Sequence, residues 1–202
     1  MSGRDAILAR IRAAVTREAS HPGVYPAPSL PASVAAFAEA LGRSGGEALG
    51  PVPRERLAAL VLERARGFAA GGRIVAEPAA AAILGAGDFE VASPDAAPAS
   101  FADVEVALAA GAVGVAENGA VAILGRDAPH RSLLVLAERL LLLLYAGRLV
   151  GDLHAGMRAL PQSALDAHHV TWIAGPSKSA DIEQTLVLGA HGPRALLVFL
   201  YA

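Results

Sequence analysis

The sequence predicts a single α/β domain whose mainly parallel sheet is covered on both faces. Near-continuous apolar runs, such as 140–144 and 196–201, alternate with segments of helical periodicity. Strands buried on both faces have this character, and their alternation with helices is typical of parallel sheets. The chain has 202 residues, of which 54% are hydrophobic, and a formal net charge of −2. These values suit one hydrophobic core and exclude dominant disorder.

The N-terminal part is predicted to be a helical extension, residues 1–45, ahead of the α/β domain of residues 46–202. Residues 3–18 have apolar side chains at helical spacing, and a proline-rich stretch follows them. A second, short helix is expected to begin at Ser33 and to end at Gly42. The few positive charges of this extension favour packing or dimerisation over nucleic-acid binding.

The α/β part is expected to alternate strands and helices along the chain. Its expected helices lie between Pro53 and Gly71, over 78–84 and over 149–160. The expected strands are 73–76, 89–92, 104–108, 113–124, 140–144, 169–174 and 196–201. Sheets of this kind place their ligand sites at the carboxyl ends of the strands.

Composition excludes several classes of site. The chain has no Cys, which removes disulfides, thiolate-bound zinc, Cys-ligated iron–sulfur clusters and thiol nucleophiles. Its near-neutral charge argues against bulk electrostatic binding of nucleic acid. The longest leucine-rich run is far shorter than the ~20 residues of a membrane-spanning helix, and the N-terminal segment lacks the apolar core of a secretory signal. We therefore expect a cytoplasmic protein without a membrane span.

The first candidate ligand site is the turn after the expected strand 169–174. It contains Lys178, the one Lys among 17 basic residues, and it is expected to open a helix. Unpaired N–H groups at a helix start, together with the Lys charge, would cradle an anion. Alternatively, the serines cap the helix and the acids complement its dipole. The candidate ligand-binding residues of this turn are Gly175, Pro176, Ser177, Lys178, Ser179, Asp181 and Glu183.

His191 completes the set of candidate ligand-binding residues, from a loop before the last strand. It either lines a site or serves as a hydrogen-bonded structural histidine. Asp181, Glu183 and His191 could in principle supply mixed oxygen and nitrogen ligands to a metal. No metal-binding spacing supports this, so no metal site is expected.

Glu117 is the candidate catalytic residue. It precedes Asn118-Gly119 within an otherwise apolar stretch, and Asn-Gly between apolar runs is a strong hairpin signal. Glu117 therefore lies either at an exposed turn or in a polar pocket, where a carboxylate serves as nucleophile, base or hydrogen-bond anchor. The residues alone favour the exposed turn.

Two motifs resemble the C-terminal signature of the LUD domain, and more narrowly the lactate-utilisation protein C family. They read Gly-Pro-Ser-Lys-Ser-Ala-Asp-Ile-Glu at 175–183 and Leu-Gly-Ala-His-Gly-Pro at 188–193. The family pattern has Thr where this chain has Ser179, and Val where it has Ala190. Upstream, Ala116-Glu117-Asn118-Gly119 resembles the Ala-Glu-Thr-Gly element of the family, with Asn in place of Thr.

This resemblance implies a three-layer, Rossmann-like fold similar to the NagB/RpiA/CoA-transferase group. It also implies a role in a system that oxidises L-lactate to pyruvate, with iron–sulfur proteins as partners. Together with the residues of the turn, it leads us to expect a non-redox component that binds a small anionic ligand or a partner at the Gly175–Glu183 turn, with Glu117 nearby. No cofactor is assigned. Glu-Asn-Gly is similar to the triplet around the catalytic glutamate of family I CoA-transferases, so the alternative is an independent CoA-transferase-like or isomerase-like enzyme that uses Glu117. A structural adaptor is the third possibility.

Overall fold

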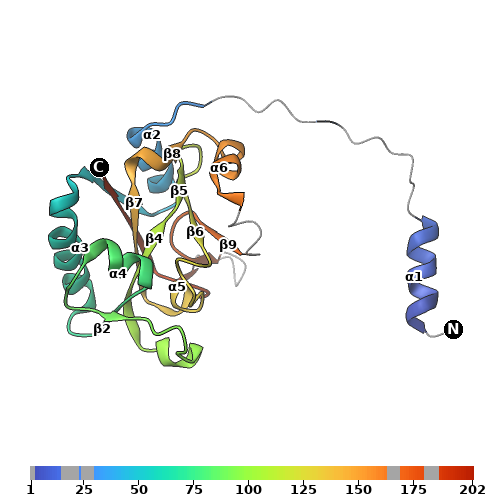
Figure 1. Cartoon of the computed structure of the whole chain (residues 1–202), viewed down its shortest axis with the longest axis horizontal. Coiled ribbons are helices and arrows are strands. Elements are labelled where there is room, and N and C mark those ends of the chain that lie inside the picture. Colours follow the sequence, from blue (N-terminus) through green and yellow to red (C-terminus); the bar gives the residue numbers. More distant parts are fainter. Residues whose placement is uncertain (1–2, 15–22, 24–29, 163–168, 180–186) are drawn as a thin grey trace.

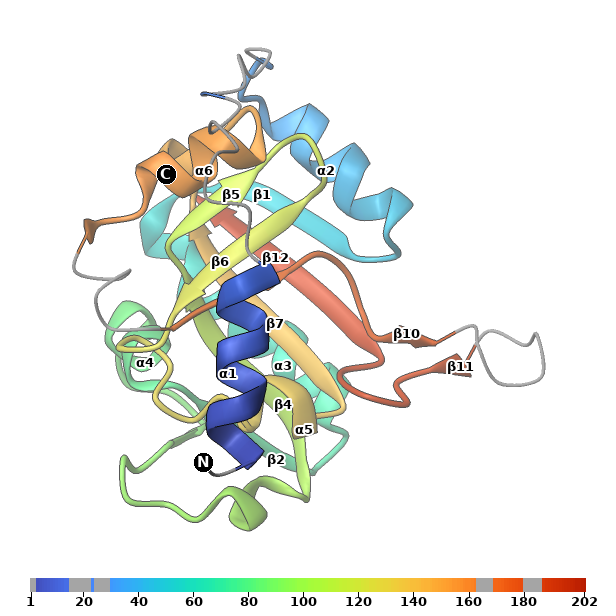
Figure 2. The same cartoon turned by 90° about the vertical axis from the view of Figure 1, so that its right-hand side faces the viewer.

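The computed structural model describes residues 3–14, 23, 30–162, 169–179 and 187–202. Its centre, seen in Figures 1 and 2, is a six-stranded sheet. Every neighbouring pair is parallel, and the order is β1-β12-β7-β4-β2-β3. The strands are β1 (Glu47–Val52), β2 (Arg73–Ala76), β3 (Glu90–Val91), β4 (Val104–Gly111), β7 (Arg139–Tyr145) and β12 (Ala195–Tyr201). The predicted α/β fold with a mainly parallel sheet is confirmed.

One face of this sheet is covered by two helices, α3 (Arg54–Ala69) and α4 (Pro78–Leu84) (Figure 1). Leu57, Val61 and Ala65 recur at helical spacing on the inner side of α3 and are fully buried. They share a hydrophobic cluster with alternate residues of the central strands, such as Leu141 and Leu143. The leucine run of β7 is apolar throughout because the sheet is buried on both sides.

The opposite face is covered by helices and a second, small sheet. The helices are α2 (Val34–Arg43) and α5 (Leu133–Leu136). The second sheet has the order β8-β5-β6-β9, with β8 (Leu149–Val150), β5 (Val113–Val115), β6 (Ala120–Leu124) and β9 (Val170–Ile173). Phe37 and Leu41 of α2 are fully buried in the cluster on this face. The third layer is therefore part helix and part sheet.

The remaining elements lie around these layers. They are α1 (Gly3–Ala14), η1 (Pro98–Phe101), η2 (Ala146–Arg148), α6 (Leu153–Ala159), β10 (Lys178–Ser179) and β11 (Val187–Leu188). Helix α1 buries none of its residues and lies away from the α/β body in Figure 1. Residues 34–43 instead share the core of that body, and the domain boundary at residue 45 stays a prediction.

Two predicted elements differ in the structure, and one strand was not predicted. The expected strand 113–124 is the hairpin of β5 and β6, which turns at Asn118-Gly119 as its sequence indicates. The expected helix 149–160 is divided, because residues 149–150 pair with β5 and α6 begins only after Asp152. Strand β1 was not predicted, since Gly50-Pro51 within it is more typical of a loop.

The largest difference concerns Lys178-Ser179, which was expected to open a helix. These residues form β10, which pairs antiparallel with β11 (Figure 2). Their backbone is therefore part of a ladder, and the expectation that a helix begins at residues 178–179 is wrong. Anion binding at the Gly175–Glu183 turn stays a prediction.

The strand order reverses direction once, at the junction of β2 and β4. From β2 the chain passes outward to β3 at the sheet edge and then returns to β4 on the other side of β2. From β4 it continues through β7 to β12. In doubly wound sheets, ligands lie outside the carboxyl ends of the strands near such a reversal.

Candidate functional site

Ser177 joins the two motifs of the predicted ligand site. Its N–H donates to the carbonyl of Pro193 at 2.8 Å, and its carbonyl accepts from the N–H of Gly189 at 3.0 Å. Its hydroxyl oxygen accepts from the backbone N–H of His191 at 3.2 Å. The structure thus brings Ser177 and His191 together, and one residue fixes the loop 189–193 at three points.

Gly175 sets the position of this turn against the end of α2. Its φ is +100°, and a Cβ there would lie 2.6 Å from the carbonyl oxygen of Ser44. An L side chain would therefore be strained both in its backbone and in its contacts. Pro176, half-buried next to it, lies on the same side, near Gly45.

Lys178 is exposed and extends toward the C-terminal end of α2. Its Nζ lies 2.8 Å from the position a Cβ on Gly45 would take. The carbonyl end of a helix carries partial negative charge, so the cation here complements the helix. Ser179 pairs with Val187 in the β10–β11 ladder, while Asp181 and Glu183 lie outside the described residues.

A hollow of about 340 Å³ opens beside His191. Its other wall is the end of α5 and the residues that follow, where Val135 is 50% and Leu136 44% exposed. Arg194 pairs with Glu138 across it, with 3.8 Å between Nη1 and Oε2. We call Ser177, His191 and this hollow the Ser177–His191 site; it combines an exposed imidazole, a paired charge and an apolar wall.

The Ser177–His191 site lies at the opposite end of the sheet from the one expected. Its loops precede β7 and β12, so it faces the amino ends of the parallel strands. The strand before Gly175 is β9, which is antiparallel to β6 in the second sheet. The turn therefore does not follow a strand of the parallel sheet, and the expectation based on that placement is wrong.

Glu117 lies in the β5–β6 turn and is exposed. Its Oε2 accepts a hydrogen bond of 3.1 Å from the N–H of Leu153, the first residue of α6. Asp152 caps the same helix by accepting from Ala155 at 2.8 Å. The exposed-turn interpretation thus agrees with its surroundings, and one carboxylate oxygen also serves a helix start.

The Glu117 turn and the Gly175 turn both rest on α2. A Cβ on Gly119 would lie 2.5 Å from the Cα of Leu41, and φ of Gly119 is +70°. Gly175 meets Ser44, at the end of the same helix. The structure therefore places the two predicted sites along one helix, although they belong to different turns.

Sequence reasoning missed Glu77, which is fully buried at the carboxyl end of β2. Its N–H donates to the carbonyl of Leu108 in β4, so it lies at the reversal of strand order. Among the residues that the structure describes, no group meets the full geometry of a hydrogen bond to either carboxylate oxygen. Burial raises the pKa of Glu77 to about 7, and the backbone of His130 opposes part of this shift. The signal in the sequence that could have indicated this site is a Glu placed directly between a short apolar strand and Pro78.

His130 covers the region of Glu77. It is buried, its Nε2 bonds with the carbonyl of Ser93, and its ring centroid lies 5.0 Å from that of Phe101. The sequence offered no pattern for this histidine, because its partners come from distant loops.

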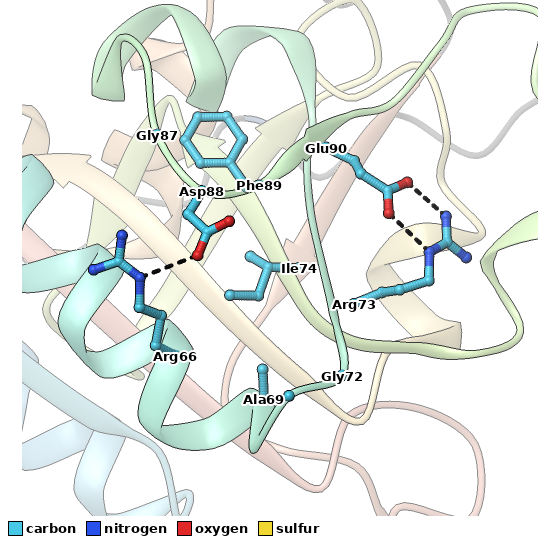
Figure 3. Close-up of a pocket in the computed structure, with 10 residues that line it drawn as sticks. Arg66, Ala69, Gly72, Arg73, Ile74, Gly87, Asp88, Phe89 and Glu90 are labelled. Atoms are coloured by element: carbon cyan, nitrogen blue, oxygen red, sulfur yellow. Dashed lines mark hydrogen bonds and ion pairs between the residues drawn. The ribbon is translucent and has the colours of Figure 1, made fainter.

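A hollow at the amino ends of β2 and β3 is lined by internally paired charges (Figure 3). Arg73 forms a two-pronged ion pair with Glu90, with 3.1 Å from Nε to Oε1 and 2.8 Å from Nη2 to Oε2. Arg66 pairs with Asp88 at 3.3 Å. Since both guanidinium groups are already paired, we interpret these ion pairs as structural contacts that hold α3, β2 and β3 together.

Among the described residues, no group of three or more His, Asp and Glu side chains could hold a metal ion. Within the same part of the chain, no helix has both the length and the hydropathy to cross a membrane.

The sequence is similar to a known family and to curated proteins over part of its length. A family model described as the LUD domain matches residues 82–201. A "Lactate utilization protein C" of Deinococcus radiodurans is 30% identical over 110 residues, covering 52% of each chain. One of the same description from Halalkalibacterium halodurans is 34% identical over 83 residues, which are 39% of this chain and 36% of that protein. The matches thus span about half the length, or less, of these curated relatives.

A solved structure has the same fold. It is the crystal structure of a DUF162 family protein from Deinococcus radiodurans, with a TM-score of 0.66 and 19% sequence identity. The match covers 84% of this chain and 96% of the other.

Proposed function

The chain belongs to the LUD domain family, and from this membership we propose that it serves lactate utilisation as a component that carries no electrons itself. The observations behind the proposal are that the LUD domain match spans residues 82–201, which include the Ser177–His191 site, and that curated relatives of the chain are named Lactate utilization protein C. In this proposal the chain acts in the oxidation of L-lactate to pyruvate.

The absence of Cys decides which part of that oxidation the chain can supply. Removal of two electrons from a hydroxy acid requires an acceptor, and protein-bound iron–sulfur clusters are held chiefly by thiolates. This chain has no Cys. The proposed electron carriers are therefore partner proteins that hold iron–sulfur clusters.

The Ser177–His191 site is the proposed contact with such a partner or with a small anion. Its features favour a partner, because Val135 and Leu136 expose apolar surface beside the exposed His191. The charge of Arg194 is paired with Glu138, and Lys178 extends toward α2, so neither cation is aimed into the hollow by itself. Apolar surface with a polar rim is typical of protein contacts.

The second candidate function is a CoA-transferase-like or isomerase-like enzyme that uses Glu117. Its exposed carboxylate favours this candidate, because a substrate can reach it. In the transferase reaction, a carboxylate oxygen attacks the carbonyl carbon of an acyl thioester and the CoA thiolate leaves. The bond to Leu153 already gives this carboxylate a structural role, which places the enzyme second.

Growth and capture experiments test the first function. Deletion of the gene is expected to impair growth on L-lactate and to leave growth on pyruvate unchanged. The wild-type gene and an Arg64→Gln control should restore growth, whereas His191→Ala combined with Leu136→Asp should not. Affinity capture from lactate-grown cells should recover an iron–sulfur protein with the wild type and with the Arg64→Gln control, and not with the double variant. Normal growth of the deletion strain, with no redundant dehydrogenase, would contradict the proposal.

Incubation with acyl-CoA separates the two functions. An acyl or CoA adduct on Glu117, seen by mass spectrometry and lost in Glu117→Gln, would favour the enzyme. Lactate-dependent reduction of a dye by the purified chain would contradict both.

A further inference from the structure

Three neighbouring strands of the parallel sheet end around a hollow that neither predicted site uses. The strands β4, β7 and β12 end at Gly111, Tyr145 and Tyr201, and all three residues line a hollow of about 400 Å³. We call it the carboxyl-end basin. Its volume lies within the range of small-molecule sites. Its position beside β4 is where doubly wound sheets bind ligands.

The basin lies far from the Ser177–His191 site. Strand β12 begins at Ala195, near that site, and reaches the basin at Tyr201. A seven-residue strand spans about 20 Å. The two places can therefore be tested separately, and failure of one does not decide the other.

One wall of the basin is aromatic. The rings of Tyr145 and Tyr201 are stacked at a tilt, with 5.6 Å between centroids. The guanidinium of Arg54 lies 5.7 Å from the Tyr201 ring centroid and holds that ring from outside the basin. Tyr145 remains 47% exposed, so it offers an accessible surface to the body of a ligand.

Among the described residues, the charged side chains that line the basin leave a positive charge in excess. They are Arg126, Asp127 and Arg148. Arg126 pairs with Asp127, with 3.6 Å between Nε and Oδ1. Arg148 is exposed, and it makes no ion pair with any residue that the structure describes. Because a guanidinium matches the planar fork of two oxygens, Arg148 favours an anion.

We propose that the carboxyl-end basin binds a small organic carboxylate, whose charge pairs with Arg148 and whose carbon skeleton packs on Tyr145. The Arg alone would accept any oxyanion, including phosphate. The aromatic wall adds contact only for a ligand with an apolar or planar body. The class assigned is thus an organic acid.

Calorimetry of the full chain tests the proposal with benzoate, acetate and inorganic phosphate as probes. Benzoate should bind severalfold more tightly than acetate or phosphate. Arg148→Gln should weaken benzoate binding by at least about tenfold, whereas Arg64→Gln, which removes a charge from α3, should leave it unchanged. Tyr145→Ala should reduce benzoate binding to the level of acetate.

Three results would overturn the proposal. They are no saturable binding of benzoate below about 10 mM, equal affinities in the wild type and Arg148→Gln, and phosphate binding at least as tight as that of benzoate. Circular dichroism and melting temperature confirm that the variants are folded. Since Arg148 and Tyr145 are exposed, both substitutions should leave the fold intact.

Discussion

The hydroxyl of Ser177 accepts a hydrogen bond from the backbone N–H of His191, 3.2 Å away. This contact joins two turns that are separated by the β10–β11 hairpin. Ser177 also exchanges backbone bonds with Pro193 and Gly189, so the side-chain bond completes a closed loop. The residues of the two motifs are therefore hydrogen-bonded to one another, and this arrangement holds His191 at the surface.

Ser177→Ala tests the cost of that bond. Removal of the acceptor leaves the N–H of His191 to water, which should lower the free energy of unfolding by about 1 kcal/mol. Ser179→Ala is the control, because the Ser179 hydroxyl has no hydrogen-bond partner within the described part of the chain. Urea unfolding of both variants measures the difference. Equal stability of the two variants would contradict the role given to Ser177.

Glu77 should make stability fall with rising pH. Burial raises the pKa of folded Glu77 from 4.5 to about 7, so between these values the folded chain keeps a proton that the unfolded chain has released. Stability therefore decreases from about pH 4.5 to about pH 7 and is level above. Glu77→Gln removes the charge and this slope, which is worth on the order of 3 kcal/mol.

Unfolding at several pH values checks the prediction for Glu77. The expected result is a more stable Glu77→Gln chain at pH 8 and a small difference near pH 4. Glu63→Gln, at an exposed position of α3, should keep the wild-type profile. Parallel profiles for wild type and Glu77→Gln would show that the carboxylate has found a partner.

Glu117 substitutions separate capping from charge. Gln can still accept from the N–H of Leu153 through its amide oxygen, so Glu117→Gln should change the free energy of unfolding by less than about 0.5 kcal/mol. Glu117→Ala removes the acceptor and should cost about 1 kcal/mol. Chemical denaturation gives both numbers. A larger effect of Gln than of Ala would argue against the capping bond.

Lys should replace Arg73 only at a measurable cost in stability. Its two-pronged bond to Glu90 depends on the planar guanidinium, and it also bonds with Asp103 and with the carbonyl of Ser100 at 2.9 Å. Arg73→Lys should therefore cost about 1 kcal/mol. Arg66→Lys is the matched control, since its single exposed ion pair with Asp88 should be worth only a few tenths of a kcal/mol. Thermal unfolding at low salt compares them.

The apolar pattern predicted the sheet because strands that are buried on both faces need apolar side chains at nearly every position. The leucine run 140–144 and the strand 196–201 are apolar at every position that the sheet covers. Asn118-Gly119 likewise predicted its turn, since Gly119 must adopt a positive φ. These signals are local, so they do not depend on which elements later meet.

The candidate sites depend on contacts between segments that are distant in the sequence, and a local sequence pattern does not predict such contacts. Serines followed by acids are typical of a helix start, yet Lys178 and Ser179 pair with residues of a returning strand. Glu77 is unusual only because β4 and the loop of His130 bury it. The basin gathers Tyr145 and Arg148, at the end of β7, with Tyr201, at the end of β12. Tyr201 meets the other two because β12 pairs with β7.

The pairing of β1 with β12 has a consequence for synthesis of the chain. Glu47 pairs with Leu197, and Leu49 with Phe199. The edge strand β1 can therefore pair only after β12, about 150 residues further along the chain, has been synthesised. Until β12 leaves the ribosome, β1 and β7 both have an unpaired border. Long-range parallel pairing is slow because the loop must close before any contact rewards it. During translation, two strand edges therefore stay unpaired and prone to pairing with other chains until nearly all of the domain has emerged. Chaperones that bind extended segments should act during that interval.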